Sequence, residues 1–176
     1  MENFGLYLME KKDAVSVAEL WHKLAHNQLN RDEYYLNNRS NQEFLMRDSV
    51  AYFENNFNNP DCFVFVAKGN NKIIGFSEMW FRKKDFFFNI EDYAYILHLF
   101  VDTSIKTDIN PLLIPYELCR ACEKKAIERG YHYIGGDVFE FNRQMKSFLE
   151  FFECKPYRTR YMKFLSNDNV GGTKHV

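Results

Sequence analysis

The sequence predicts a mixed α/β fold whose sheet is mostly antiparallel and ends in one parallel pair of strands. Segments with strand and helix periodicity follow one another in the order β-α-α-β-β-β-α-β-α-β. The three consecutive central strands favour antiparallel pairing. The helix and strand that come next form a crossover to a parallel neighbour.

The composition fits one domain, expected over residues 1–165, with a flexible polar tail at 166–176. Hydrophobic residues make up 46% of the chain, which excludes global disorder. No apolar run is long enough to span a membrane, and the N-terminus lacks the pattern of a secretory signal. With 23 Lys+Arg against 24 Asp+Glu, no global positive field favours nucleic acid. We therefore expect neither a membrane nor a nucleic-acid partner.

The four cysteines are predicted to be reduced thiols in a cytoplasmic protein. Cys119 and Cys122 have C-x-x-C spacing, but no further ligands at comparable spacing follow them, so no metal site is expected.

The N-terminal part of the chain predicts a strand over 4–9 and two helices. The spacing of Val17, Leu20, Trp21 and Leu24 is helical, and 16–19 fits a capping box at the helix start. The polar stretch 26–39 reads as a loop or a short helix. A second capping box at 40–43 starts the second helix, whose apolar face is formed by Met46, Val50, Phe53 and Phe57.

The central part predicts a hairpin of strands 62–68 and 72–81 about a Gly-Asn-Asn turn. A loop with three adjacent phenylalanines, 86–88, leads to a buried strand over 93–101. The next helix opens at Pro111 or Pro115 and ends before Gly130, a favourable C′ residue. The last predicted elements are strand 131–139, helix 142–152 and strand 157–165.

Four segments, 72–76, 94–101, 126–131 and 138–142, resemble in order and spacing the GNAT superfamily of N-acetyltransferases. The resemblance covers about Phe4 to Leu165. It implies a GNAT-like acyl-CoA N-acyltransferase fold, in which strands 93–101 and 131–139 are parallel and splay apart at their C-terminal ends. It also implies acetyl transfer from acetyl-CoA to an amine of a small molecule or peptide. A non-catalytic GNAT-fold module for binding or dimerisation, including a homodimer, is the alternative.

The family's pyrophosphate loop, R-x-x-G-x-G, is degenerate here. Lys106 takes the basic position, whereas Ile109 and Pro111 replace the glycines and Asp108 adds a negative charge. Pro111 has no N–H, and a β-branched residue resists positive φ. The helix N-terminus still offers N–H groups to a phosphate.

The resemblance places CoA contacts on the edge of strand 93–101, in this loop, at the helix start and at an asparagine that otherwise caps the last helix. They are Leu99, Phe100, Val101, Lys106, Thr107, Ile109, Asn110, Leu112, Leu113 and Asn142.

Four residues are candidates for the chemistry. The tyrosine that protonates the leaving thiolate in the family is replaced by Leu149, and the family's acidic residue on the fourth strand by Tyr95, a poor base. Glu78 is the favoured base because it is a carboxylate on an apolar face shared with Ile74, Phe76 and Trp80; a salt bridge is the alternative. Asp137 is the next candidate.

His98 is the fourth candidate, because a histidine on this strand serves as base in some family members. Strict alternation places it on the face opposite Tyr95, where a packing role is expected, unless a bulge reverses the faces.

Overall fold

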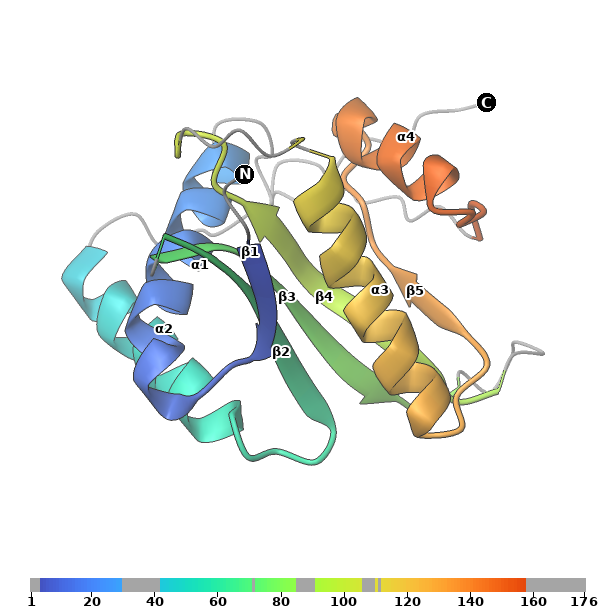
Figure 1. Cartoon of the computed structure of the whole chain (residues 1–176), viewed down its shortest axis with the longest axis horizontal. Coiled ribbons are helices and arrows are strands. Elements are labelled where there is room, and N and C mark those ends of the chain that lie inside the picture. Colours follow the sequence, from blue (N-terminus) through green and yellow to red (C-terminus); the bar gives the residue numbers. More distant parts are fainter. Residues whose placement is uncertain are drawn as a thin grey trace, which may run out of the picture.

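The structure is a computed structural model that describes residues 4–29, 42–70, 72–84, 91–105, 110 and 112–157. Its described elements form three layers, with α1 and α2 on one face of a five-stranded sheet and α3 on the other (Figure 1). In chain order they are β1 (Phe4–Leu8), α1 (Ala14–Leu29), α2 (Gln42–Asn56), β2 (Cys62–Gly69), β3 (Lys72–Arg82), β4 (Tyr93–Val101), α3 (Leu113–Glu128), β5 (Ile134–Gly136) and α4 (Arg143–Phe151).

The sheet has the predicted topology, with strand order β1-β2-β3-β4-β5. The first four strands are antiparallel, and β2 and β3 form the predicted hairpin. After the crossover through α3, β5 pairs with β4 in parallel. The mixed fold and its one parallel pair are therefore confirmed.

Each face of the sheet has its own core. Val17 and Leu20 of α1 and Phe53 of α2 pack on Val66 and Phe76 of the sheet. On the other face, α3 covers residues from β2, β3 and β4, and α4 packs on α3 through Phe148 and Phe152. Full burial of an aliphatic or aromatic side chain contributes about 1.5–3 kcal/mol, so both layers add substantially to stability.

The helix boundaries differ from the predicted ones. α1 begins at Ala14, before the expected capping box at Ser16, because the 3₁₀ turn Lys11–Asp13 leads straight into it. In that turn the Asp13 carboxylate accepts the Glu10 N–H at 3.1 Å. α1 also continues through Leu29, into the stretch predicted as a loop or short helix.

The start of α3 and the length of β5 were also predicted wrongly. α3 begins at Leu113, at neither of the two prolines, whereas Gly130 ends it with the expected positive φ of 79°. β5 has three residues instead of the nine of 131–139, because its ladder to β4 stops at Gly136. The predicted strand 157–165, the tail 166–176 and the phenylalanines 86–88 lie outside the described residues.

Candidate functional site

The two parallel strands separate half-way along β4. β4 has nine residues, but its ladder to β5 runs only from Ala94 opposite Ile134 to Ile96 opposite Gly136. Beyond Gly136 the chain turns toward α4 while β4 continues straight (Figure 1). The backbone edge of β4 from 97 to 101 is therefore not paired with β5.

Gly136 is required where the strands part. A Cβ at this position would lie 2.8 Å from the carbonyl oxygen of Ile96. We expect Gly136→Ala to lower the free energy of unfolding by about 1–3 kcal/mol, the usual cost of overpacking. Gly135→Ala is the matched control, because a Cβ there meets nothing within 4 Å. Equal urea midpoints for the two variants would contradict this close approach.

The N-terminus of α3 lies at the end of the sheet where the strands part (Figure 1). Asn110 occupies part of it: its Oδ1 accepts the Leu112 N–H at 3.0 Å and its carbonyl accepts the Leu113 N–H at 2.9 Å. Pro115, in the first turn, has no N–H to donate. This terminus therefore has fewer open donors than an ordinary helix start. Lys106, Thr107, Ile109 and Pro111 lie outside the described residues.

α4 borders the same end of the sheet. The Asn142 Oδ1 caps it by accepting the Met145 N–H at 3.2 Å, so the predicted capping role is confirmed. This bond uses the amide oxygen and leaves the NH₂ group able to donate. Leu149 is part of the apolar cluster between α3 and α4, together with Ile96 and Leu99 of β4. No hydroxyl stands at the position of the family's tyrosine.

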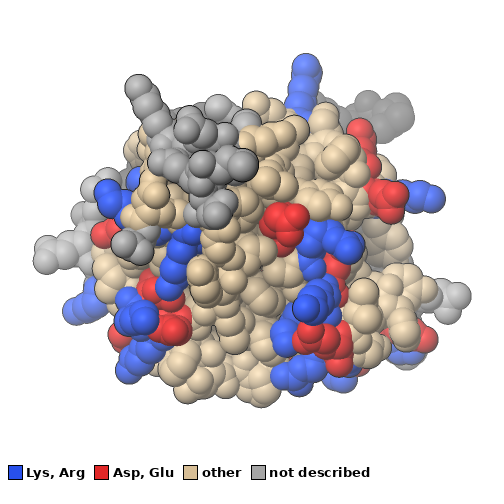
Figure 2. Space-filling model, in the orientation of Figure 1, with Lys and Arg blue, Asp and Glu red and all other residues tan. Residues whose placement is uncertain are grey.

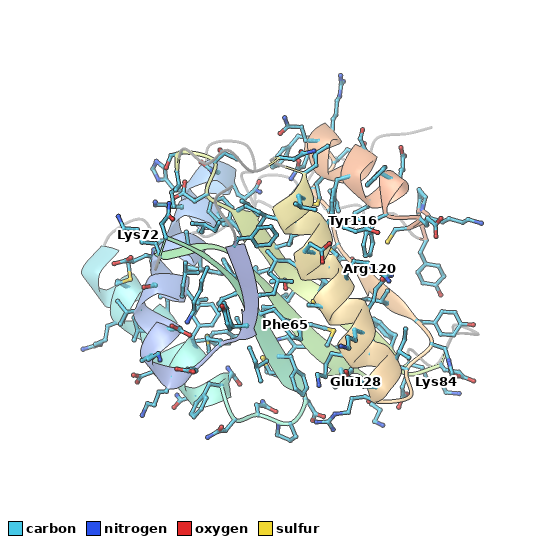
Figure 3. The ribbon with its side chains drawn as sticks, viewed as in Figure 1. Phe65, Lys72, Lys84, Tyr116, Arg120 and Glu128 are labelled. Carbon is cyan, nitrogen blue, oxygen red and sulfur yellow. The ribbon has the colours of Figure 1, made fainter. Side chains whose placement is uncertain are left out.

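Tyr116 belongs to the same cluster but projects from α3. It lies on the side of α3 toward α4 (Figure 3), with ring centroids 6.1 Å from Phe151 and 5.6 Å from Phe152. Its ring serves to pack the two helices together.

A β-bulge in β4 decides which side chains share a face. The register to β3 places His98 opposite Glu78 and Ile96 opposite Met79, so Leu97 is the extra residue. Tyr95, opposite Trp80, therefore lies on the same face as His98, toward α1 and α2. The expectation that strict alternation separates Tyr95 from His98 is wrong.

A second irregularity affects β3. Its register to β2 passes from Gly75 opposite Ala67 to Ile73 opposite Lys68, so Ile74 is the extra residue. Ile74 accordingly packs on the α3 face, whereas Phe76 packs toward α1 and α2. Glu78 shares its face with Phe76 and Trp80 as predicted, but not with Ile74.

Glu78 is fully buried, and its carboxylate is the centre of a polar network. Its Oε1 accepts the Trp80 indole N–H at 2.6 Å and the Tyr52 hydroxyl of α2. Its Oε2 lies 2.7 Å from Nδ1 of His98, whose Nε2 is 3.2 Å from the indole nitrogen of Trp21. The network joins α1, α2, β3 and β4.

The network fixes the tautomer of His98. An indole nitrogen can only donate, so Nε2 of His98 must be the acceptor from Trp21. The imidazole proton is then on Nδ1, which donates to Glu78. A carboxylate that holds Nδ1–H in this way directs the basic lone pair to Nε2.

Glu78 is ionised in this setting. Burial alone would raise its pKa, but the hydrogen bonds from His98, Tyr52 and Trp80 outweigh burial and hold the pKa of Glu78 below its ordinary value. Burial, together with the charge of Glu78, raises the pKa of Tyr52. Tyr52 is therefore a neutral donor at physiological pH.

A second pair of polar groups lies where the strands part. Asp137 directly follows β5, and its exposed carboxylate is hydrogen-bonded to the hydroxyl of Tyr95. Burial and this carboxylate raise the pKa of Tyr95 to about 12, so Tyr95 is a phenol at neutral pH. The Arg82 guanidinium lies 5.2 Å from the centroid of the Tyr95 ring.

Several solved structures share this architecture. A variant of the BH1408 protein from Bacillus halodurans superposes with a TM-score of 0.74 at 19% identity, covering 92% of this chain and 99% of that one. The aminoglycoside N-acetyltransferase AAC(6')-Iy in complex with CoA has a TM-score of 0.69 at 12% identity, covering 95% and 97%. The ribosomal-protein-alanine N-acetyltransferase from Brucella melitensis biovar Abortus 2308 has 0.64 at 14% identity, covering 92% and 99%. The chain has the GNAT fold.

No protein-family model matches the sequence, and no curated protein matches it significantly. The likeness therefore concerns the GNAT fold alone. Within that fold, the structure brings Glu78 and His98 into direct contact and places Tyr95 beside Asp137. Leu99 and Phe100 lie on the stretch of β4 that is not paired with β5: Leu99 packs toward α3 and α4, whereas Phe100 packs toward α1 and α2.

Sequence reasoning missed two members of the polar network, Trp21 and Tyr52. Both occupy ordinary positions on amphipathic helices, and only the packing of α1 and α2 on the sheet brings them to Glu78 and His98. Trp80 could have been found, because it follows Glu78 on the same face of one strand.

The four cysteines form no disulfide with one another. The cysteines are free thiols, and burial raises the pKa of Cys122 to about 12, so it is protonated. Among the described residues, no group of three metal-ligating side chains comes together, and no helix is long and apolar enough to cross a membrane. On the face shown in Figure 2, charges of both signs are interspersed.

Proposed function

We propose that this protein is an N-acetyltransferase that transfers an acetyl group from acetyl-CoA to an amine of a small molecule or peptide. The observation that carries the proposal is the edge of β4 beyond Ile96, which β5 leaves unpaired beside the N-terminus of α3. An extended pantetheine arm, which contains amide groups, can pair with such an edge as a strand would.

The pyrophosphate would lie at the N-terminus of α3. Asn110 already occupies two N–H groups there, so the remaining attraction comes from the helix dipole and from basic side chains in the preceding loop. Asn142, whose NH₂ group is not used in capping, would donate to a pantetheine carbonyl. Acetyl-CoA acts as a co-substrate, and the chemistry requires no metal.

His98 is the proposed proton acceptor. It lies two residues past the last β4–β5 pair, and its Nε2 has the lone pair because Nδ1–H is held by Glu78. Glu78, predicted from sequence as the base, is fully buried, and its carboxylate accepts hydrogen bonds from Tyr52 and Trp80 as well as from His98. In this proposal it is a positioning residue that keeps the imidazole oriented and balances its charge after protonation.

Asp137 is a second candidate base. Asp137 is exposed, directly follows β5 at the point where β5 separates from β4, and is hydrogen-bonded to Tyr95. A carboxylate there could take the proton directly or through a water molecule.

The leaving thiolate has no positioned acid at Leu149. A thiol with a pKa of about 8.5 is a tolerable leaving group without one. Loss of such an acid typically costs roughly 10²–10⁴-fold, so we propose a slow enzyme.

The acceptor is proposed only as a class. The solved neighbours include an aminoglycoside acetyltransferase and a ribosomal-protein-alanine acetyltransferase, whose printed names concern a small-molecule amine and a peptide amine. We further propose a cytoplasmic location, where acetyl-CoA is available, and keep a homodimer as an expectation.

Lys106→Ala tests the basic side chain of the loop. If this ammonium contacts the pyrophosphate at the surface, its removal should weaken CoA binding by about 1 kcal/mol, roughly fivefold in Kd. Isothermal titration with CoA measures this effect, and Lys72→Ala on β3 is the control. An unchanged Kd would remove Lys106 from the site.

Thermal denaturation with acetyl-CoA and with CoA tests the proposed function. A ligand at about 100 times its Kd stabilises a protein by ~2.7 kcal/mol, which is a readily measured rise in Tm. A panel of small-molecule and peptide amines, followed by mass spectrometry for acetylated product, tests turnover. Stabilisation without any product would favour the alternative, a non-catalytic GNAT-fold binding or dimerisation module. The absence of both would contradict acetyl transfer.

A further inference from the structure

The basic nitrogen of His98 is covered by a tryptophan. The indole N–H of Trp21 donates to Nε2 at 3.2 Å, and the two rings meet edge to face with centroids 6.1 Å apart. Trp21 comes from α1, on the opposite side of the imidazole from Glu78. The lone pair that the proposed reaction needs is therefore already in use in this structure.

This contact and a proton on Nε2 exclude each other. Neutral imidazole has one acceptor nitrogen, whereas imidazolium has two donors and no acceptor. An indole N–H that faces a protonated Nε2 would place two donors against each other. We infer that Trp21 is a gate on His98, closed while Nε2 is free of a proton and released when Nε2 takes one.

The role of this gate in catalysis rests on the proposed function. There, the acceptor arrives as an ammonium, gives one proton to Nε2 of His98 and becomes the neutral amine that attacks the thioester. Glu78 stays a carboxylate and keeps its bond to Nδ1–H throughout. As the substrate's proton reaches Nε2, the indole N–H of Trp21 loses its acceptor and turns away.

The backbone of α1 has a separate anchor beside the gate. Nε2 of His22 lies 3.1 Å from Oγ of Ser49 on α2, which ties the two helices together. This contact holds α1 on α2 independently of the hydrogen bond between Trp21 and His98.

Other titratable groups lie near Trp21 and His98, and a change in their charge could also move the Trp21 signal. His22 lies next to Trp21, with ring centroids 5.2 Å apart. From β3 the imidazole faces Glu78, which in turn contacts Tyr52 of α2 and the thiol of Cys62 on β2 at 4.0 Å. Burial raises the pKa of Cys62 to about 12, so neither this thiol nor the Tyr52 phenol changes charge in mild acid.

NMR of the indole N–H groups tests the gate with protons as the ligand. The chain has two tryptophans, and both donate within this network, so the spectrum has two indole signals that report on it. In Trp80→Phe only one indole N–H signal remains, which identifies the signal of Trp21. As the pH is lowered with the fold intact, we expect the Trp21 signal to move when Nε2 of His98 takes up a proton and the hydrogen bond is lost.

His98→Gln is the matched variant. A glutamine amide can accept from Trp21 with its oxygen and donate to Glu78 with its NH₂, but it is not a base and takes up no proton. The Trp21 signal should then be insensitive to pH, whereas in His22→Gln it should move as in the wild type. A Trp21 signal that is constant in the wild type, or that moves equally in His98→Gln, would overturn the gate.

Trp21→Phe tests the catalytic role of the gate separately. It keeps an aromatic ring in the core and removes the N–H. With a verified acceptor amine we expect kcat/KM to rise severalfold, because Nε2 no longer has to lose a partner. An unchanged or lower value would overturn this role. A wild-type protein without turnover would instead contradict the proposed function, while the NMR result would still decide the coupling of Trp21 to His98.

Discussion

Glu78→Ala is expected to lower the free energy of unfolding by about 3 kcal/mol. Glu78 is the shared acceptor for His98, Tyr52 and Trp80, and a buried donor left without a partner costs about 1–3 kcal/mol. Tyr52 is partly exposed and can turn to water, so the three costs are not fully additive. In a chain of this size the loss corresponds to a fall in Tm of roughly 6–12 °C.

Glu128→Ala is the control for this prediction. It removes a glutamate from an exposed pair with Lys125 on α3 (Figure 3), an interaction that contributes at most about 1 kcal/mol. Calorimetry of the two variants gives the comparison. If Glu78→Ala had the same Tm as Glu128→Ala, the network would not stabilise the fold.

The contribution of Glu78 should depend on pH in a defined direction. Hydrogen bonds hold its pKa in the folded protein below the ordinary value, although burial opposes them. Such a carboxyl stabilises the folded state above its unfolded-state pKa of about 4.3, and the contribution is lost as the pH falls through the folded-state pKa. The Tm difference between wild type and Glu78→Gln should therefore shrink as the pH falls below about 4.3.

His98→Gln is expected to lower the rate of acetyl transfer by roughly 10²–10⁴-fold at neutral pH, the usual contribution of a positioned base. The variant can keep the hydrogen bonds to Glu78 and Trp21, so acetyl-CoA should bind as in the wild type. Single-turnover kinetics with saturating acetyl-CoA separates the two effects. Asp137→Asn is the discriminating partner: a large loss there, with His98→Gln unaffected, would assign the base to Asp137.

Glu78→Gln should act on the same step by a different route. Its NH₂ group would face Nδ1–H of His98 as a second donor, which favours the other tautomer and removes the lone pair from Nε2. We expect a slower rate with intact acetyl-CoA binding. Wild-type activity in this variant would show that Glu78 does not position the base.

The sequence was sufficient for the order and pairing of the main strands. Alternation, glycine and asparagine at turns, and the length of connections are local signals, and they placed β4 at its observed bounds. The length of β5 could not be predicted from the sequence. The strand ends where it separates from β4 at Gly136, and no local sequence signal marks that point. The start of α1 depended on a 3₁₀ turn at Lys11–Asp13 that has no strong pattern.

The candidate site was readable only in part. Glu78 stood out because a carboxylate on an apolar strand face requires partners. Its contact with His98 depends on one extra residue in β4, Leu97, and a bulge of this kind inverts every face assignment beyond it. Trp21 and Tyr52 come from helices far away in sequence, so their hydrogen bonds exist only after the layers pack.

Hydrogen exchange of β4 with and without acetyl-CoA tests the central proposal, that the unpaired edge of this strand holds the pantetheine arm. Amides in the segment 97–101 should exchange more slowly when acetyl-CoA is present, because the arm supplies the partners that β5 does not. The β2–β3 hairpin, which is already paired on both edges, should exchange at the same rate in both conditions. Protection that is confined to other segments, or no protection at saturating acetyl-CoA, would contradict the proposed site.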